Sequence, residues 1–412
     1  MNILIIGNGG REHAIGIKLK KDNPTDELFF AKGNGGTESI GTNVSISSLQ
    51  EMVDFATNEK MDLTIVGSEA LLMEGIVDEF EKRNLKIFGP NRAAALLEGD
   101  KAFAKIFMNE FGVRTATHKA FTNIDGAVDY VKNHTYPLVI KATGLAAGKG
   151  VFIVPSFENA VTTIKDLLIN KIMGSAGDEI VIEEFLEGFE VSVLSVFNKN
   201  KIYPFISAKD HKKIYENEKG PNTGGMGAVA PNPLYTEEIA RDFDEHIMNP
   251  TLKGLLERNL LFSGVIFFGL MVVNKKCYLL EYNMRLGDPE TQAILPLLNT
   301  NFTEVIENAL NGNEIQLNWK NQHSCCVVAA SKGYPDTPET GKTITGLHNI
   351  NVDYRIAGAF KNGDSLITSG GRVLNVIGLG DTLHAAREKA YQAINNIAFE
   401  GMYFRKDIGE IK

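Results

Sequence analysis

The first hundred residues alternate between short apolar runs and longer stretches in which apolar residues recur every three or four positions. The apolar runs at 2–7, 27–31, 63–67 and 86–90 are rich in Ile, Leu and Phe, which favours β-strands. The stretches at 11–21, 48–60 and 70–84 have the periodicity of amphipathic helices. This order predicts a doubly wound parallel α/β domain, in which ligands bind at the carboxyl ends of the strands.

Each of these strands runs into a glycine-containing loop, at 7–10, 33–36, 67–69 and 89–91. The first loop is close to a dinucleotide-binding turn, but Glu12 stands where the third glycine is needed. No acidic residue follows the second strand to bind a ribose, because the chain continues with Lys32 and Gly33. The pattern therefore disfavours an NAD-dependent oxidoreductase, an alternative that only NAD binding would revive. A phosphate at the start of the first helix fits the loop.

The remaining pattern predicts two further parts. Residues 118–187 have a small α+β pattern, and 190–325 hold strands and loops that include the apolar run 263–273. The end of the chain has short strands and turns, followed by a helical stretch at 384–397. We expect an α/β substrate-binding domain at 1–100, a central domain at 101–325 with a subdomain at about 118–187, and a small β-rich C-terminal domain at 326–412.

Composition and charge exclude several classes of protein. The net charge of −9 comes without a basic block, which argues against nucleic-acid binding. The longest apolar run is shorter than the roughly 20 residues of a membrane span. The first residues lack a basic leader, and the three cysteines, Cys277, Cys325 and Cys326, lack metal-ligand spacing. We expect a cytoplasmic protein with buried thiols.

The stretch "KATGLAAGKGVFIV", residues 141–154, raises the question of phosphate binding. It is not a Walker loop, because three residues separate Gly144 from Gly148 and because Gly150, in place of Ser or Thr, follows Lys149. The apolar run 151–154 indicates a strand, so the segment predicts a strand–loop–strand hairpin. A mobile lid over an anion and an ordinary hairpin with an exposed lysine both fit this segment.

The segment "YLLEYNMRLGD", 278–288, predicts a strand with a polar face. Alternation places Glu281, Asn283 and Arg285 on that face. The opposite face receives Leu280, Tyr282 and Met284. A carboxylate and an amide oxygen two residues apart suit Mg²⁺, and an arginine can bind a carboxylate or phosphate with two hydrogen bonds. The alternative is a surface strand whose polar face has no ligand.

Three other segments carry polar groups of possible function. Residues 181–190 join an apolar strand to an acidic linker that could bind a nucleoside, or could be a surface turn. Residues 208–231 place Asp210 and His211 before a second glycine-rich loop, and we expect His211 to be exposed and without a role. The helix predicted at 99–112 carries Lys101 and Lys105 on one face, which alone is typical of a solvated surface.

Taken in order, "KATGLAAGKGV", "VIEEFLEGFEVSV" and "LLEYNMRLGDPETQ" resemble the ATP-grasp superfamily. With "GNGGREHA", "DHKK", "PNTGGMGA" and "RLGDPETQ", the chain is similar to the phosphoribosylamine–glycine ligase family from residue 2 to about 407. The resemblance implies a lid that closes over ATP and requires Mg²⁺ or Mn²⁺. It implies ligation of glycine to 5-phosphoribosylamine through glycyl phosphate, which gives glycinamide ribonucleotide, ADP and phosphate in de novo purine biosynthesis.

The resemblance also assigns residues. For ATP it implies Lys101, Lys105, Lys141, Gly144, Gly148, Lys149, Gly150, Glu183, Glu184, Phe185, Leu186 and Glu190. For the metal it implies Glu281 and Asn283. For the two substrates it implies Gly9, Gly10, Asp210, Thr223, Gly224, Gly225, Arg285 and Gly287. Arg285, Asp210 and Lys149 are the expected catalytic residues.

The expected partners are the small molecules glycine and 5-phosphoribosylamine, with a transient contact to the enzyme that supplies this unstable amine. No nucleic acid or membrane is expected. A carboxylase or a formate-using ligase of the same superfamily and a catalytically silent nucleotide-binding protein are the alternatives. The C-terminal part is expected to cover the site and not to supply catalytic groups.

Overall fold

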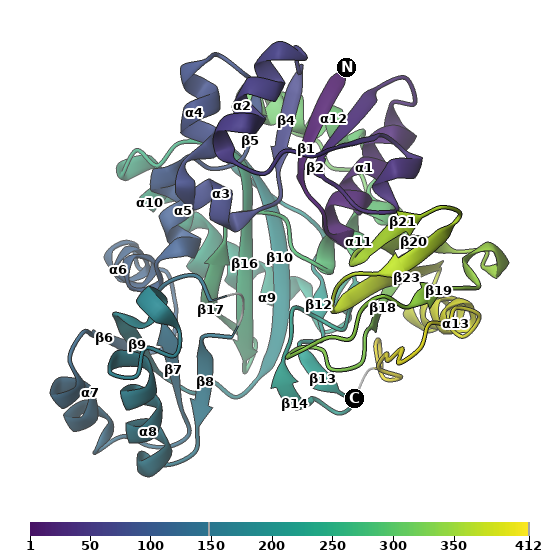
Figure 1. The fold of residues 1–412 in the computed structure, drawn as a ribbon. Helices are drawn as coiled ribbons and strands as arrows, with labels where there is room; N and C mark the ends of the chain where they lie inside the picture. Colours follow the sequence, from purple (N-terminus) through teal and green to yellow (C-terminus); the bar gives the residue numbers. More distant parts are fainter. Residues whose placement is uncertain (147–148, 411–412) are drawn as a thin grey trace.

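The computed structural model describes residues 1–146 and 149–410. The N-terminal part is the predicted parallel sheet, with strand order β3-β2-β1-β4-β5. Its strands are β1 (Asn2–Gly7), β2 (Glu27–Lys32), β3 (Thr42–Val44), β4 (Leu63–Val66) and β5 (Ile87–Phe88). Its helices are α1 (Gly10–Asp22), α2 (Leu49–Asn58), α3 (Glu69–Glu74), α4 (Ile76–Lys82) and α5 (Arg92–Gly99). Figure 1 shows this part at the top of the molecule, in purple and blue.

The single helix expected at 70–84 is wrong. The chain forms α3 and α4, which are separated at Gly75 with φ +90°. A left-handed residue cannot continue a right-handed helix, and glycine adopts this conformation without the penalty that a Cβ brings. The apolar spacing continues on both sides of Gly75, so periodicity alone did not reveal the break.

The subdomain expected at about 118–187 is a four-stranded sheet of order β6-β9-β7-β8. Its elements are β6 (His118–Phe121), α7 (Ile124–Val131), β7 (Leu138–Ala142), β8 (Val151–Val154), α8 (Phe157–Leu168) and β9 (Ile180–Glu184). Strands β7 and β8 pair antiparallel, with Lys141 opposite Val151, which confirms the predicted hairpin. Figure 1 shows this subdomain projecting at the lower left.

The central sheet has the order β11-β10-β16-β17. Its strands are β10 (Phe189–Asn198), β11 (Ile202–Pro204), β16 (Ser263–Val273) and β17 (Lys276–Asn283). Helices α6 (Lys101–Phe111), α9 (Glu237–Phe243), α10 (Asn249–Glu257), α11 (Glu290–Ile294) and α12 (Phe302–Leu310) accompany it. Helix α6 begins at the Asp100 cap and ends at Gly112. One apolar core joins Ile5 of β1 to Leu194 of β10 and Phe302 of α12, so the N-terminal and central parts pack together.

The C-terminal part shares a sheet with the central part, of order β12-β15-β18-β23-β20. Its strands are β12 (Lys209–Asp210), β15 (Gly227–Ala230), β18 (His323–Ala330), β20 (Asp353–Ile356) and β23 (Arg372–Gly380). The hairpin β13 (Lys213–Tyr215) and β14 (Lys219–Asn222), a small sheet of β19 (Thr343–Ile344), β21 (Ala359–Asn362) and β22 (Ser365–Thr368), and helix α13 (Leu383–Ile394) complete it. The domain boundary that the sequence suggested between residues 325 and 326 falls inside strand β18.

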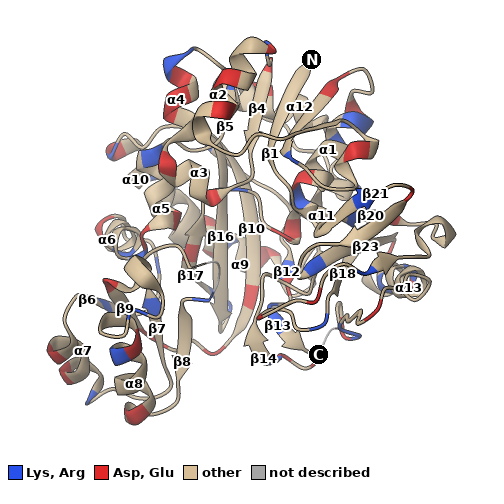
Figure 2. Cartoon of the chain, in the orientation of Figure 1, with Lys and Arg blue, Asp and Glu red and all other residues tan. Residues whose placement is uncertain are grey.

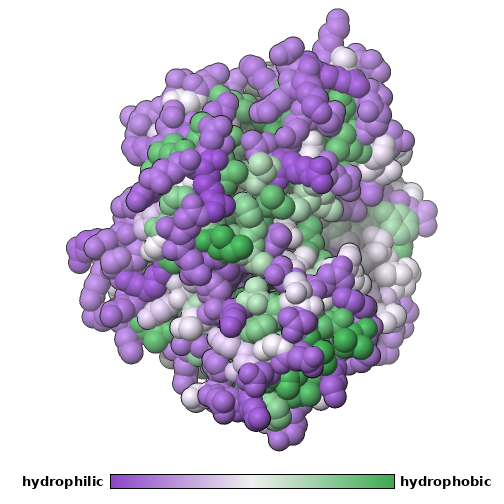
Figure 3. All heavy atoms as spheres, turned by 90° about the vertical axis from the view of Figure 1, so that its left-hand side faces the viewer, coloured by the Kyte–Doolittle hydropathy of each residue, from purple (hydrophilic) through white to green (hydrophobic). Residues whose placement is uncertain are grey.

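The surface and the helices give three observations on partners. In the described part of the chain, Lys and Arg lie interspersed with Asp and Glu over the molecule (Figure 2). The face on the side of the lid subdomain is largely hydrophilic, with several separate apolar patches (Figure 3). Among the described residues no helix is long and apolar enough to cross a membrane.

Candidate active site

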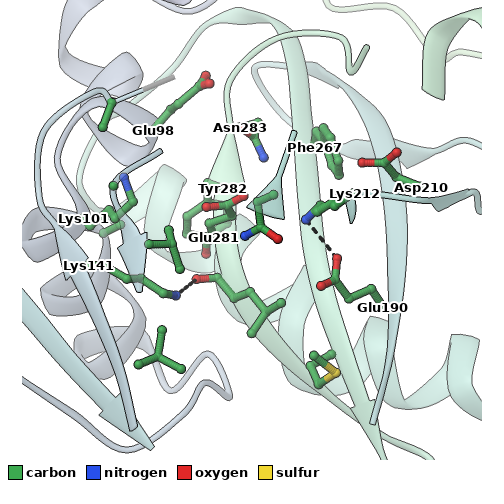
Figure 4. A pocket seen from close by; sticks show the side chains of 18 of the residues that line it. Glu98, Lys101, Lys141, Glu190, Asp210, Lys212, Phe267, Glu281, Tyr282 and Asn283 are labelled. Carbon is green, nitrogen blue, oxygen red and sulfur yellow. Dashed lines mark hydrogen bonds and ion pairs between the residues drawn. The ribbon is translucent and has the colours of Figure 1, made fainter. Parts of the chain in front are cut away.

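A cavity of about 530 Å³ lies where the parts of the molecule meet. Its walls come from α6, the β7–β8 hairpin, the linker after β9, strand β17 and the loop that follows it, and Arg372 of β23. The expected site residues that line it are Lys101, Lys105, Lys141, Gly150, Glu183, Glu184, Phe185, Leu186, Glu190, Asp210, Thr223, Gly224, Glu281, Asn283 and Arg285. Figure 4 shows several of their side chains around one space.

Some expected residues do not line this cavity. Among the described residues these are Gly9, Gly10, Gly144, Lys149, Gly225 and Gly287. Lys149 is exposed on the hairpin, and Gly148 lies outside the described residues. The Gly9 amide, expected near a phosphate, donates to Glu12 Oε2 at 2.7 Å. Glu12, which stands where a dinucleotide-binding turn has its third glycine, therefore accepts the hydrogen bond that the Gly9 amide was expected to give to a phosphate.

A buried carboxylate joins two lysines at one end of the cavity. Glu183 Oε2 lies 2.9 Å from Lys141 Nζ, and Glu183 Oε1 lies 3.1 Å from Lys105 Nζ. Burial alone would raise the pKa of Glu183, but these ammonium groups outweigh burial and hold that pKa below its ordinary value. The Lys141 ammonium also donates to the Leu280 carbonyl, the contact dashed at the left of Figure 4. Lys141 thus spans from the lid sheet to the central sheet.

The resemblance implies a linker that starts after Ile182, but strand β9 continues to Glu184. Glu183 and Glu184 belong to strand β9, where Glu183 pairs with His118 of β6 and Val139 of β7. The Glu184 carboxylate accepts the Thr117 amide at 2.7 Å. Both residues still line the cavity, but the segment free of strand pairing starts at Phe185.

The two lysines of α6 differ in their surroundings, and neither forms the solvated face that their spacing alone suggested. The Lys105 ammonium donates to Thr115 Oγ1 at 2.6 Å and pairs with Glu183, and burial foremost lowers the pKa of Lys105 to about 8. Lys101 lies one helical turn earlier at the cavity wall. In the described part of the chain, its ammonium has no hydrogen-bond or ion-pair partner. Lys101 is therefore the lysine available to an anion.

Strand β17 departs from simple alternation at its polar face. Gly269 lies opposite Glu281, whereas the next residue of β16, Leu270, lies opposite Leu279. Leu280 is thus the extra residue of a β-bulge, and it lines the cavity next to Glu281 in place of facing the core as expected. Leu279 takes the core position and is fully buried.

The Glu281 carboxylate is charged and open to a ligand. Burial alone would raise the pKa of Glu281, but Lys212, Lys141 and Lys101 hold it below its ordinary value. Within the described residues no side chain hydrogen-bonds this carboxylate. The neighbouring Asn283 offers an amide oxygen, which accepts Arg285 Nη2 at 3.2 Å. An ionised carboxylate without a partner beside an amide oxygen fits a hard divalent cation. Among the described residues, no cluster of three or more His, Cys, Asp or Glu side chains offers another metal site.

Arg285 is held by acidic residues that the sequence analysis did not assign. Its Nη2 lies 3.0 Å from Glu98 Oε1, and its Nε lies 3.7 Å from Glu69 Oε2. Glu98 Oε2 accepts the Met284 amide at 2.6 Å, so one carboxylate fixes both the backbone and the side chain of this turn. The only sequence signal for Glu98 is its position just before the "GDK" motif.

Three carboxyl groups, of which that of Glu290 is buried, and a lysine form the other end of the cavity. Lys212 Nζ lies 2.9 Å from Glu190 Oε2, as the right side of Figure 4 shows, and Glu190 foremost raises the pKa of Lys212. Burial and the nearby Glu290 raise the pKa of Asp210 well above its ordinary value, and burial raises that of Glu290. Ser192 Oγ donates to Glu290 at 3.1 Å. Asp210 Oδ1 is buried without a partner among the described residues, and a ligand that donates a hydrogen bond would satisfy it.

Two arginines reach the cavity from the N- and C-terminal parts. Arg11 Nη1 donates to the Leu286 carbonyl at 3.0 Å. Arg372 Nη1 donates to the carbonyls of Gly224 at 2.5 Å and Asp288 at 2.8 Å, and its Nη2 lies 3.3 Å from Asp288 Oδ1. The C-terminal part therefore places a cation in the cavity wall and is more than the expected cover.

His211 was expected to be exposed, and this is wrong. Its side chain is buried, and its Nε2 accepts the Gly409 amide at 3.4 Å. Its Nδ1 lies 3.4 Å from Glu218 Oε1. The charged sequence around His211 suggested solvent, but the end of the chain packs over it.

Comparison with known proteins gives consistent matches along the chain. The phosphoribosylglycinamide synthetase N domain matches residues 1–98, the ATP-grasp (A) domain of the same family matches 99–291, and the C domain matches 324–411. A phosphoribosylamine–glycine ligase of Fusobacterium nucleatum subsp. nucleatum is 50% identical over 420 residues, which cover 100% of this chain and 99% of that protein.

Solved structures agree with these matches. The crystal structure of phosphoribosylamine–glycine ligase from Thermotoga maritima has a TM-score of 0.88 and 33% identity, and covers 99% of this chain and 100% of that one. The biotin carboxylase domain of Hydrogenobacter thermophilus 2-oxoglutarate carboxylase, solved with MgADP, has a TM-score of 0.76 at 16% identity, and covers 98% and 91%. This second likeness shows the shared fold alone.

Proposed function

The chain belongs to the phosphoribosylglycinamide synthetase family, and from this premise we propose how the residues of its cavity carry out the reaction. It is an ATP-grasp carbon–nitrogen ligase that joins glycine to phosphoribosylamine in purine biosynthesis. The roles of individual residues, the metal and the cellular setting are our proposals.

We place ATP between the lid subdomain and the central sheet. Phe185 and Leu186 follow strand β9, so their backbone groups are free to bind the adenine. Lys101 and Lys141 contact the phosphates, with Lys149 joining from the β7–β8 hairpin. The Lys101 ammonium, which has no partner among the described residues, supports this arrangement. Lys105 acts indirectly, because it pairs with Glu183, which also pairs with Lys141. Glu190 is the proposed ribose ligand, and Lys212 holds its carboxylate.

Glu281 and Asn283 are the residues that would hold Mg²⁺ or Mn²⁺. The ion supplies charge neutralisation at the phosphate oxygens when it is bound. The protein contributes a carboxylate kept ionised by surrounding lysines and an amide oxygen two residues away. Arg285 shares the Asn283 oxygen and is fixed by Glu98, so it orients this amide.

The reaction needs an activated acid, because attack of an amine on a free carboxylate would have to expel oxide. Transfer of the γ-phosphoryl group of ATP to a glycine carboxylate oxygen gives ADP and glycyl phosphate. The amine of phosphoribosylamine then forms the C–N bond, inorganic phosphate leaves, and the amine loses a proton. In phosphoryl transfer the protein mainly positions groups and neutralises charge, which Lys101, Lys141 and Arg285 can do.

The two substrates occupy the end of the cavity formed by Asp210, Glu290 and the glycine-rich loop. Asp210 Oδ1, buried without a partner in the described part of the chain, is suited to accept from an amino group. Arg285 and Arg372 offer positive charge for a carboxylate or a phosphate. Exclusion of water by the lid would protect the acyl phosphate from hydrolysis.

The observation that carries this arrangement is Glu281, whose carboxylate no described side chain hydrogen-bonds and whose pKa the nearby lysines lower, between the lysine end and the carboxyl end of one cavity. The test is phosphate release from ATP by the purified protein with Mg²⁺, with glycine and freshly made phosphoribosylamine each present or omitted. We expect release only when both are present. Release with bicarbonate or formate in place of glycine would favour the other ATP-grasp enzymes, and ATP binding without release would favour a silent nucleotide-binding protein.

We also propose the three-part division at 1–100, 101–325 and 326–412 as functional units around this cavity. A cytoplasmic location is proposed because the described cysteines are free and buried, as suits a reducing compartment. A transient contact with the enzyme that supplies phosphoribosylamine is proposed from the instability of that amine alone.

A further inference from the structure

The last part of the chain lies against the β13–β14 hairpin. We call residues 403–410 the tail segment. The Lys406 amide donates to Glu216 Oε1 at 3.2 Å, and Asp407 Oδ2 accepts the Asn217 amide at 2.8 Å. The Tyr403 ring meets the Tyr215 ring edge-on with centroids 6.3 Å apart. The tail segment therefore follows the turn and one strand of this hairpin.

Arg405 is the centre of this contact. Its side chain is 1% exposed, although it carries a charge. Nη1 donates to the Lys213 carbonyl at 2.9 Å, Nη2 lies 2.7 Å from Glu218 Oε1, and Nε lies 2.8 Å from Asp407 Oδ1. A buried arginine needs such partners, because an unpaired buried charge is costly. The guanidinium thus joins strand β13 and the turn of the hairpin to the tail segment.

The acids around Arg405 are ionised at neutral pH. Burial alone would raise the pKa of Glu218, but His211 and Arg405 lower it to about 2. Burial opposes the same shift at Asp407, whose pKa is also held at about 2, foremost by Arg405. The contacts of Arg405 are therefore charge-assisted hydrogen bonds, which are stronger than neutral ones.

The base of the same hairpin is a wall of the active-site cavity. Lys212, Lys213, Asn222, Thr223 and Gly224 line the cavity. The Thr223 amide and hydroxyl both donate to the Lys212 carbonyl, at 2.7 and 2.8 Å, which closes the base of the hairpin. A displacement at Lys213 therefore moves the residues that face the substrates.

We propose that Arg405 is a positioning residue for the ligation. From the tail segment, Arg405 holds the β13–β14 hairpin so that Lys212 and Thr223 at its base keep their place in the cavity. This inference rests on the proposed placement of glycine and phosphoribosylamine at that end of the cavity. It gives the end of the chain a part in the active site, although Arg405 itself does not line the cavity.

The test compares Arg405→Ala and Arg405→Lys with wild type in the full-length protein. We expect Arg405→Ala to raise KM for glycine or phosphoribosylamine by about tenfold and to change kcat less, because binding geometry is lost and the phosphoryl-transfer groups stay. Arg405→Lys should fall between, since an ammonium cannot reproduce the fork of donors. Guanidinium ion added to Arg405→Ala should restore part of the lost affinity. Arg258→Ala is the matched control, because Arg258 pairs with Glu110 on the surface.

Hydrogen exchange of the Thr223 amide in the ligand-free protein tests the positioning role without reference to substrates. Faster exchange in Arg405→Ala than in Arg258→Ala is expected. Unchanged exchange of the Thr223 amide together with unchanged KM values would overturn the inference. An Arg405→Ala enzyme that is only less thermally stable, and whose kinetic constants are all impaired to the same degree for that reason, would overturn it as well. If Arg405→Ala does not fold, Glu218→Gln, which removes one partner at the surface, replaces it with the same readouts. The wild-type requirement for both substrates remains the separate test of the proposed function.

Discussion

At the residue scale, the proposed metal site depends on the charge of Glu281. Replacement by Gln keeps the size of the side chain but removes the hard anionic oxygen, so we predict that Glu281→Gln lowers Mg²⁺-dependent phosphate release about 100-fold. The Mg²⁺ concentration for half-maximal rate should also rise. Both are measured in a Mg²⁺ titration at saturating ATP. Glu27→Gln, an exposed change in β2, is the control, and a Glu281→Gln enzyme with the wild-type titration curve would refute the metal assignment.

Lys105 gives a prediction on protonation. Its pKa is lowered to about 8, foremost by burial, while Glu183 opposes the shift. A lowered lysine pKa means that the ammonium is present below about pH 8 and lost above it, whereas an ordinary lysine keeps its proton to about pH 10.4. An NMR titration of the lysine side-chain resonances should therefore find Lys105 titrating near pH 8.

Glu183→Gln tests the direction in which the Glu183 carboxylate shifts the pKa of Lys105. Removing the carboxylate removes the interaction that favours the ammonium, so the Lys105 titration should move to lower pH. Bound ATP, being an anion, should move it to higher pH in the wild type. A Lys105 titration that is the same in Glu183→Gln would contradict the buried ion pair.

The types of residue in the site could be predicted from sequence, because the motifs are local. Glu281 and Asn283 lie two positions apart, and Lys141 and Lys149 belong to one short glycine-rich stretch. The partners of these groups could not be predicted. Glu98 reaches Arg285 from another part of the chain, and Arg372 belongs to a strand that was expected to cover the site without supplying groups to it. Such contacts depend on tertiary packing, which a single sequence does not reveal.

At the element scale, the proposed role of the β7–β8 hairpin is to bring Lys149 to ATP. Lys149 is exposed on this hairpin and does not line the cavity, so it can reach ATP only when the hairpin closes. We predict that Lys149→Ala raises KM for ATP about tenfold and leaves KM for glycine unchanged. Lys165→Ala on α8, an exposed lysine of the same subdomain, is the control. Equal ATP dependence in both variants would exclude a role of Lys149 at the phosphates.

Elements were predicted where one physical signal dominated. Strands β1, β2 and β4, helix α6 with its end at Gly112, and the β7–β8 hairpin follow from apolar patterns and a glycine stop. The prediction failed at Gly75, where periodicity continued through a left-handed residue. It failed again at Leu280, because an inserted bulge residue shifts alternation and leaves no mark in composition.

At the scale of the whole molecule, the C-terminal part is joined to the centre by strand pairing. Residues 227–230 of β15 pair with 324–327 of β18, and Val229, Val327 and Ala390 belong to one apolar core. Pairing between strands so distant in the chain has no local signal, which is why the sequence suggested separate domains with the C-terminal one as a cover. The cavity is complete only when Arg11, Lys101 and Arg372 come together from the three parts.

We therefore predict that the fragment 1–322 is not an active enzyme. Without 323–412, β15 loses its neighbour in the sheet, Asp288 loses Arg372, and the β13–β14 hairpin loses Arg405. An exposed sheet edge beside an opened apolar core also favours aggregation. Co-expression of 1–322 with 323–412 should restore soluble protein and phosphate release that requires both substrates, because β18 can pair in trans. If 1–322 alone reached wild-type kcat/KM for glycine, the C-terminal part would be dispensable, and the roles given to Arg372 and Arg405 would both fall.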